Sequence, residues 1–191
     1  MIPELGHFAL ILALAVALVQ AIIPGMGLLR RRADWMAIAK PAALIQFALV
    51  LLAYGILTYS FIVHDFSVLY VANTSNSELP LIYRISGVWG AHEGSLLLWV
   101  LILSAWTAIL AMYSKHYPVD MGAGVISVLG FISIGFLLFS LFTSNPFIRL
   151  FPVPIDGGDL NPLLQDPVMA IHPPMLYMGY VGFAVPFAFA I

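Results

Sequence analysis

The amino-acid sequence predicts an all-α polytopic membrane protein, a helical transmembrane bundle with about five spans. Of the 191 residues, 62% are hydrophobic and only 8% are charged. The mean hydropathy of +1.04 lies far outside the range of soluble globular domains. Charge-free runs long enough to cross a hydrocarbon core recur along the chain. A soluble fold would need more surface charge to stay dispersed, so we expect the lipid bilayer to cover most of this protein.

The first four spans are predicted from runs that contain no Asp, Glu, Lys or Arg. A helix needs roughly 20 apolar residues to cross the hydrocarbon core. The first run is not a typical secretory signal peptide, because Glu4 precedes it and Arg30 follows it, so we expect it to remain as an anchor. The four runs cover residues 5–29, 41–63, 95–114 and 121–143.

A fifth apolar run begins at His172 and is still apolar at Ile191, which predicts a fifth span over residues 172–191. No polar residue closes this run, and a helix that ended there would leave its last turn in lipid. We therefore expect residues 1–191 to be a single transmembrane bundle and the N-terminal part of a longer chain, either a truncated product or one piece of a split gene.

The distribution of Lys and Arg predicts the orientation, because basic residues in short loops resist translocation. Five of the seven flank the two short connections, which places these connections in the cytoplasm and the N-terminus outside. The two other connections, residues 64–94 and 144–171, are long and become periplasmic loops. Connections of this length in a compact bundle are usually binding loops, so we expect functional surface on the outer face. The five inner basic residues are Arg30, Arg31, Arg32, Lys40 and Lys115.

Several functional classes are excluded by what the sequence lacks. There is no cysteine, so the chain holds no disulfide and no thiolate metal site, and it is not itself a c-type cytochrome. There is no basic stripe of the kind that nucleic-acid binding requires. The four complete spans contain no charged residue, which argues against a proton relay or an ion-coupling site.

His172 is the strongest candidate metal ligand. The two prolines that follow it, Pro173 and Pro174, disfavour helical geometry at His172 and favour the start of a helix after it. We therefore expect His172 to lie at a rigid helix mouth near the water interface. A haem iron ligand needs such fixed presentation, beside apolar side chains that can pack on the porphyrin. The alternative is that His-Pro-Pro only starts a helix.

The segment VWGAHEGSLLLW, residues 88–99, is a second candidate. Trp89 and Trp99 flank it at positions typical of the aromatic belt of membrane proteins. Gly90 precedes an adjacent histidine and glutamate, His92 and Glu93, and allows close backbone approach. These residues either belong to the belt or orient a cofactor ligand and line its cavity.

The segment NPLLQDP, residues 161–167, lies directly before His172. Asn161, Gln165 and Asp166 can bond backbone groups, and two prolines restrict the path of the chain, which predicts a rigid turn that positions the next helix. Such a turn would support His172 without touching iron. A role of Asp166 as a direct catalytic acid has no support in the sequence, and no catalytic residue is identified.

Three motifs taken together, WGAHEGSLLLW, LFTSNPF and NPLLQDPVMAIHPPMLYMGYVG, resemble the CcmF proteins of cytochrome c maturation. The likeness runs through essentially the whole chain. It implies a multi-pass protein of the bacterial inner membrane whose periplasmic face works with small accessory membrane subunits. Such proteins take haem from a haem chaperone and join its vinyl groups to the thiols of apocytochrome c.

The resemblance also implies that His172, in the HPP motif, is an axial ligand of the haem iron. The family's tryptophan-rich haem-handling motif and its other haem-ligating histidines are not found in this sequence, so further ligands are expected outside this chain. We accordingly expect a haem lyase component that does not act alone. Two alternatives stay open: a haem exporter or haem-chaperone loading protein, and a non-catalytic membrane scaffold or quinone-reactive subunit.

Overall fold

The computed structural model describes residues 1–191. All of its regular elements are helices, and the only β-type pairing is an isolated antiparallel bridge between Val68 and Arg149. The helices are α1 Ile2–Leu29, α2 Ala33–Met36, α3 Ala39–Ile62, α4 Leu69–Thr74, α5 Leu81–Gly87, α6 His92–Met112, α7 Val119–Phe142, α8 Pro167–Gly182 and α9 Ala184–Ala190, with 3-10 turns η1 Ser114–His116 and η2 Pro162–Leu164. The predicted all-α membrane fold is confirmed.

Five helical segments are long and apolar enough to cross a membrane: α1, α2 with α3, α6, α7, and α8 with α9. Helices α1, α3, α6 and α7 begin two or three residues before the predicted runs, because a helix continues into the polar residues at the interface, and α2 extends the second segment back to Ala33. The fifth differs more. It begins at Pro167, five residues before the predicted start at His172.

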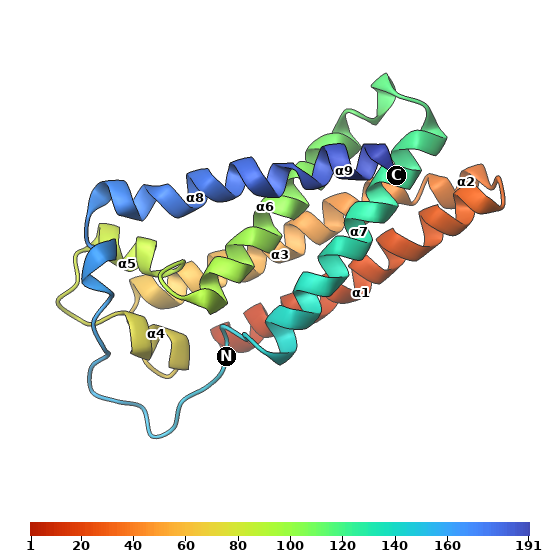
Figure 1. Ribbon diagram of the computed structural model, residues 1–191. Coiled ribbons are helices and arrows are strands. Elements are labelled where there is room, and N and C mark those ends of the chain that lie inside the picture. The colour runs from red at the N-terminus through yellow and green to blue at the C-terminus, as the bar shows by residue number, and fades with distance from the viewer.

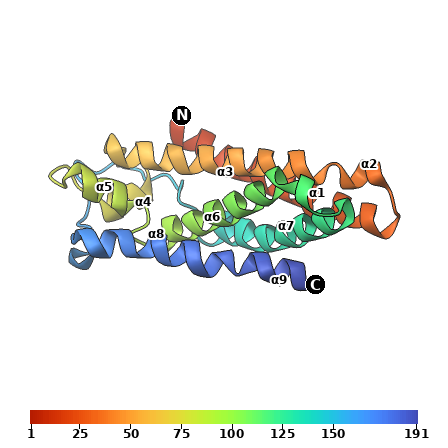
Figure 2. The same ribbon diagram turned by 90° about the horizontal axis from the view of Figure 1, so that it is seen from above.

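The first four spans form a bundle, and the fifth lies along one side of it. α1 packs against α3 and α7, and α6 packs against the same two helices, which closes the bundle. α8 lies on α6, and α9 lies on α7 (Figures 1 and 2). Phe183 separates α8 from α9, three residues before Pro186. Pro186 provides no N–H for the carbonyl of Gly182, which accounts for the break at this point.

Small side chains allow α1 to approach its neighbours closely. Ala9, Ala13, Ala17 and Ala21 recur every four residues on one face of α1, and all four are buried. On α7, a Cβ added to Gly130 would lie 2.9 Å from the backbone nitrogen of Ala21. Without a hydrophobic driving force between helices in lipid, such small-residue contacts provide the van der Waals packing that holds a membrane bundle together.

One end of the bundle is covered by residues 64–91 and 144–166, which we call the loop layer; it contains α4, α5 and η2 (Figure 1). Its two segments are joined by backbone hydrogen bonds. Leu69 N donates to the carbonyl of Ile148 at 2.8 Å, and Gly158 N donates to the carbonyl of Ala72 at 2.7 Å. The two long connections therefore form one structural unit, while the opposite end has only the short connections at α2 and η1.

Candidate functional site

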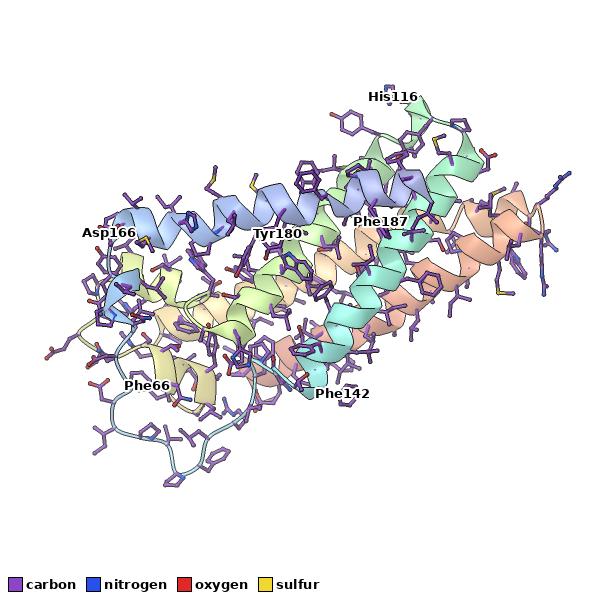
Figure 3. All side chains as sticks on the ribbon, viewed as in Figure 1. Phe66, His116, Phe142, Asp166, Tyr180 and Phe187 are labelled. Carbon is purple, nitrogen blue, oxygen red and sulfur yellow. The ribbon has the colours of Figure 1, made fainter.

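Helix α8 begins where its local sequence provides a helix N-cap. The carboxylate of Asp166 accepts hydrogen bonds from Val168 N at 2.9 Å and from Met169 N at 3.0 Å. Pro167 occupies the first helical position, where a missing N–H has no cost. Figure 3 shows Asp166 at the end of α8 that adjoins the loop layer. The start of α8 is therefore set by Asp166 and Pro167 and not by Pro173.

The turn before α8 is stabilised by the two other polar residues of its motif. The side chain of Asn161 accepts a hydrogen bond from Leu163 N at 3.1 Å. The amide of Gln165 donates to the carbonyl of Leu160 at 3.1 Å, and Leu160 is buried. The prediction of a rigid turn ahead of the helix agrees with these bonds, each of which fixes the chain locally.

The expectation that His172 lies at a helix mouth is wrong. His172 lies within α8, as do Pro173 and Pro174. The preference of a residue before proline for extended geometry is overcome here, because the Asp166 cap has already started the helix and α6 supports it. His172 is the sixth residue of the helix, about 9 Å along its axis from Asp166.

His172 lies on the side of α8 that faces away from the bundle. An α-helix turns about 100° per residue, so His172 lies roughly opposite both Ala170 and Val181. Those two residues are the buried positions of α8, at 5% and 2% exposure. His172 itself is exposed. Its neighbours on this outward face are also exposed and apolar: Val168, Met175, Leu176 and Phe183.

The two prolines leave carbonyl groups of α8 without their usual partners. In an α-helix the N–H of residue i bonds the carbonyl of residue i−4, and proline has no N–H. Pro174 therefore leaves the carbonyl of Ala170 free. The indole Nε1–H of Trp89 donates to this carbonyl at 2.9 Å. Two segments that the sequence presents as separate motifs are thus joined by a hydrogen bond.

The loop that carries Trp89 is ordered around the hydroxyl of Tyr70. This hydroxyl donates toward the carbonyl of Val88 at 3.0 Å and accepts from Ala91 N at 3.1 Å. Burial raises the pKa of Tyr70 above its ordinary value, so the hydroxyl stays protonated and able to donate. The role of Tyr70 cannot be recognised in the sequence, because a single tyrosine in a long connection forms no recognisable pattern.

Two glycines, one in this loop and one in the first turn of α6, are required by close contacts. A Cβ at Gly94 would overlap the carbonyl oxygen of Val88 and lie 2.7 Å from the Tyr70 hydroxyl. A Cβ at Gly90 would lie 2.8 Å from the side chain of Leu160, the residue directly before the segment NPLLQDP. The glycines therefore allow the turn before α6 to fold tightly under α4 and η2.

His92 and Glu93 lie at the start of α6, with His92 Nδ1 3.3 Å from Glu93 Oε2. The His92 side chain is 69% exposed. With Trp99 it lines a groove of about 310 Å³ between α6, α7 and α8, to which α8 contributes Tyr177 and Tyr180. This groove lies on the bundle side of α8, so the structure does not bring His92 and His172 to the same face.

Trp99 packs within this groove. Its ring lies edge to face against Phe136 of α7 and is tilted against Tyr180 of α8, with ring centres 6.0 Å apart in the second pair. Its indole nitrogen is buried without a hydrogen-bond partner. Trp99 thus serves as a packing residue between three helices.

Helices α6 and α8 both fall within the part of the chain that matches a known protein family. The model of the cytochrome C assembly protein family matches residues 89–191, which is more than half of the chain and includes α6 to α9 but not Tyr70. The chain belongs to this family. The match begins at Trp89 and includes His172, so the two motifs joined by the Trp89 hydrogen bond fall within one family domain.

Individual relatives agree with this membership. The cytochrome c-type biogenesis protein CcmF of Pseudomonas aeruginosa is 60% identical over 192 residues, which cover 100% of this chain. The protein of the same description from Pseudomonas fluorescens is 59% identical over 191 residues. A solved structure described as cytochrome c heme lyase CcmF matches 98% of this chain with a TM-score of 0.83 and 27% identity. The chain spans about 29% of the length of each of these proteins.

The solved relative is described as a heme lyase, and the residues of α8 in this chain fit one side of a haem site. His172 supplies an imidazole, which is a common axial ligand of haem iron. It stands on an exposed apolar helix face, as a porphyrin ring requires. No group of three or more His, Cys, Asp or Glu side chains could hold a metal ion anywhere in the chain. The fit is therefore to a single axial ligand, not to a complete protein-only metal centre.

Proposed function

We propose that this chain is the N-terminal membrane portion of a cytochrome c haem lyase component. In this proposal it receives haem from a haem chaperone and supports thioether attachment to apocytochrome c at the periplasmic face of the bacterial inner membrane. The single observation that carries the proposal is the position of His172, an exposed imidazole on the outward apolar face of α8, close to the loop layer. The printed names of the relatives, cytochrome c-type biogenesis protein and heme lyase, support it.

The orientation in the membrane supports the same proposal. The basic residues of the first connection lie beside α2, and Lys115 lies in η1, at the end of the bundle opposite the loop layer (Figure 1). Figure 3 marks this far end at His116. By the preference of basic residues for the cytoplasm, the loop layer then faces the periplasm, where apocytochrome c would be met.

In this proposal the chain binds and orients, and further residues outside it complete the site. His172 would hold the haem iron through the lone pair of a ring nitrogen. Met175 and Leu176 provide apolar surface next to it. The bound haem supplies the vinyl groups that become thioethers, and the partner apocytochrome supplies the thiols. The second axial position is left to a group outside this chain, such as another segment of the complete protein or a small accessory subunit.

Replacement of His172 tests the proposal. His172→Ala in the complete membrane protein should lower c-type cytochrome production at least tenfold and remove most of the Soret absorbance of captured haem, because an axial ligand is lost. His116→Ala is the matched control, since His116 is exposed at the opposite end of the bundle, and it should retain both. Wild-type haem capture and cytochrome production in His172→Ala would overturn the assignment.

Co-purification separates the lyase from a haem-chaperone loading protein. Stable capture of apocytochrome c together with haem supports the lyase. Capture of the haem chaperone without apocytochrome would replace the lyase by the loading function. A complete protein that shows no Soret band under any of these conditions would favour a scaffold and would contradict haem handling by this chain.

A further inference from the structure

The hydrogen bond between Trp89 and Ala170 explains how a helix that contains two consecutive prolines keeps its shape. Pro173 and Pro174 remove the N–H groups that would bond the carbonyls of Met169 and Ala170. Met169 is 44% exposed, on an open side of the helix. Ala170 is 5% exposed and faces the bundle, so its carbonyl cannot turn to water. A buried carbonyl requires a partner, and Trp89 Nε1 is that partner at 2.9 Å.

We propose that Trp89 is a positioning residue for His172: its indole N–H replaces the N–H that Pro174 lacks and thereby fixes the helical turn that carries His172. The hydrogen bond joins two residues of this chain and does not depend on bound haem. Its consequence for haem rests on the proposed function of His172.

The indole is able to act as a fixed donor because the loop that holds it is rigid. The carbonyl of Trp89 accepts a hydrogen bond from the Ser95 hydroxyl at 2.8 Å, and its N–H bonds the carbonyl of Ser86 at 3.2 Å. The Tyr70 hydroxyl orders the residues on both sides of it. Trp89 is therefore anchored to α6 and α4, and it transmits their position to α8.

The bonded carbonyl lies two residues before His172, within the same helical turn. When consecutive N–H groups are absent, a helix can bend at that point, and the direction of the side chains beyond it changes. A donor attached from the bundle side holds the turn closed. Because His172 points away from the bundle, any bend at Ala170 would change the direction of its ring relative to the outward face.

A second indole bond to the same helix provides a control. Trp106 of α6 donates to the carbonyl of Met178 at 3.4 Å, below the turn that carries His172. The residue four positions after Met178 is Gly182, which has an N–H, so the carbonyl of Met178 keeps a possible helical partner. Trp106→Phe also removes an indole donor to α8, but the carbonyl of Met178 can still accept a hydrogen bond from the N–H of Gly182.

We call the hydrogen bond from Trp89 to the carbonyl of Ala170 the clamp. Amide hydrogen–deuterium exchange of the haem-free protein tests it directly. Trp89→Phe keeps an aromatic ring but removes the donor, and it should speed exchange at Ile171, His172 and Met175 by roughly tenfold. Pro174→Ala restores a helical N–H for Ala170, so the double variant Trp89→Phe with Pro174→Ala should return to near wild-type exchange. Trp106→Phe should leave these three amides unchanged.

Two results would overturn the clamp. One is unchanged exchange in Trp89→Phe, which would leave Trp89 as an ordinary member of the aromatic belt. The other is failure of Pro174→Ala to suppress the effect, which would show that Trp89 acts through general packing. Because Pro174→Ala is chosen to restore one hydrogen bond, rescue cannot be explained by a change in protein yield.

The haem spectrum of the complete protein then links the clamp to His172. Trp89→Phe should reduce haem retention about tenfold and shift the Soret band, while the double variant recovers both. If exchange responds as expected but the spectrum does not change, the clamp holds and the haem role of His172 fails. If the spectrum responds without a change in exchange, the clamp itself is refuted.

Discussion

The four-helix bundle and the fifth span are built in different ways. In the most apolar stretches of the first four spans, between 33% and 44% of the residues are buried, whereas in α8–α9 only 11% are buried. The bundle packs small residues into close helix contacts, as at Ala21 and Gly130. The fifth span lies on the bundle by one face, and at Ala170 and Met178 its backbone is hydrogen-bonded by tryptophans.

This difference shows how the chain combines rigidity with an open surface. A helix whose outward face must bind a ligand or a partner cannot be held in place by packing on all sides. α8 is instead fixed at its start by Asp166 and at its proline turn by Trp89. Its outward face, with His172, remains free for the haem and the further residues that we propose complete the site.

The largest expected difference between the two regions is the change in stability when a glycine is replaced by alanine. Gly94→Ala places a methyl group against the backbone of Val88, which is fixed by Tyr70, and should cost about 3 kcal/mol or more. Gly179→Ala on α8 meets nothing within 4 Å and should stabilise the chain by about 0.5–1 kcal/mol. Thermal unfolding of both variants of the 191-residue chain in detergent measures this; equal losses would contradict the comparison.

The next effect concerns the start of α8. Asp166→Ala removes the acceptor for Val168 N and Met169 N and should destabilise the helix by about 1 kcal/mol. Asp166→Asn keeps a side-chain acceptor and should lose far less. Amide exchange at Val168 and Met169 measures the fraying, and equal exchange in both variants would show that the helix start does not depend on this cap.

The smallest effect is a local pH dependence in the loop layer. Hydrogen bonds from the hydroxyl and N–H of Ser77 and from Gly157 N hold the pKa of Asp156 below its ordinary value. A lowered pKa means that the contribution of Asp156 is fully present above its ordinary pKa and is lost as the pH falls through the lowered value. Ser77→Ala should raise the pKa of Asp156 in a carboxyl-carbon NMR titration. No change would show that these bonds do not form in solution.

Much of the fold could be predicted because the membrane imposes a simple rule. A charge-free run of sufficient length must become a helix to satisfy its backbone, and this rule located the first four spans to within a few residues. The start of the fifth span was predicted wrongly. The run was counted from its apolar residues and from Pro173, whereas the helix begins at the cap formed by Asp166 and Pro167.

The candidate site could be predicted in its residues but not in its connections. The sequence singled out Trp89 and His172 separately. It gave no reason to expect a hydrogen bond between Trp89 and Ala170, which are 81 positions apart. It left open whether His92 belongs to the aromatic belt or orients a cofactor ligand, and the fold puts His92 and His172 on different sides of α8. Tyr70 was not found at all.

The sequence by itself determined that this protein is a helical membrane bundle with one histidine next to two prolines in its fifth span, because hydropathy acts over short stretches of chain. Only the tertiary structure decided which way that histidine faces and what holds its helix. The direction of a side chain on a helix depends on which face another helix covers. A carbonyl that lacks its helical partner because of a proline can accept a hydrogen bond from any donor that folding brings near, and here the donor is Trp89.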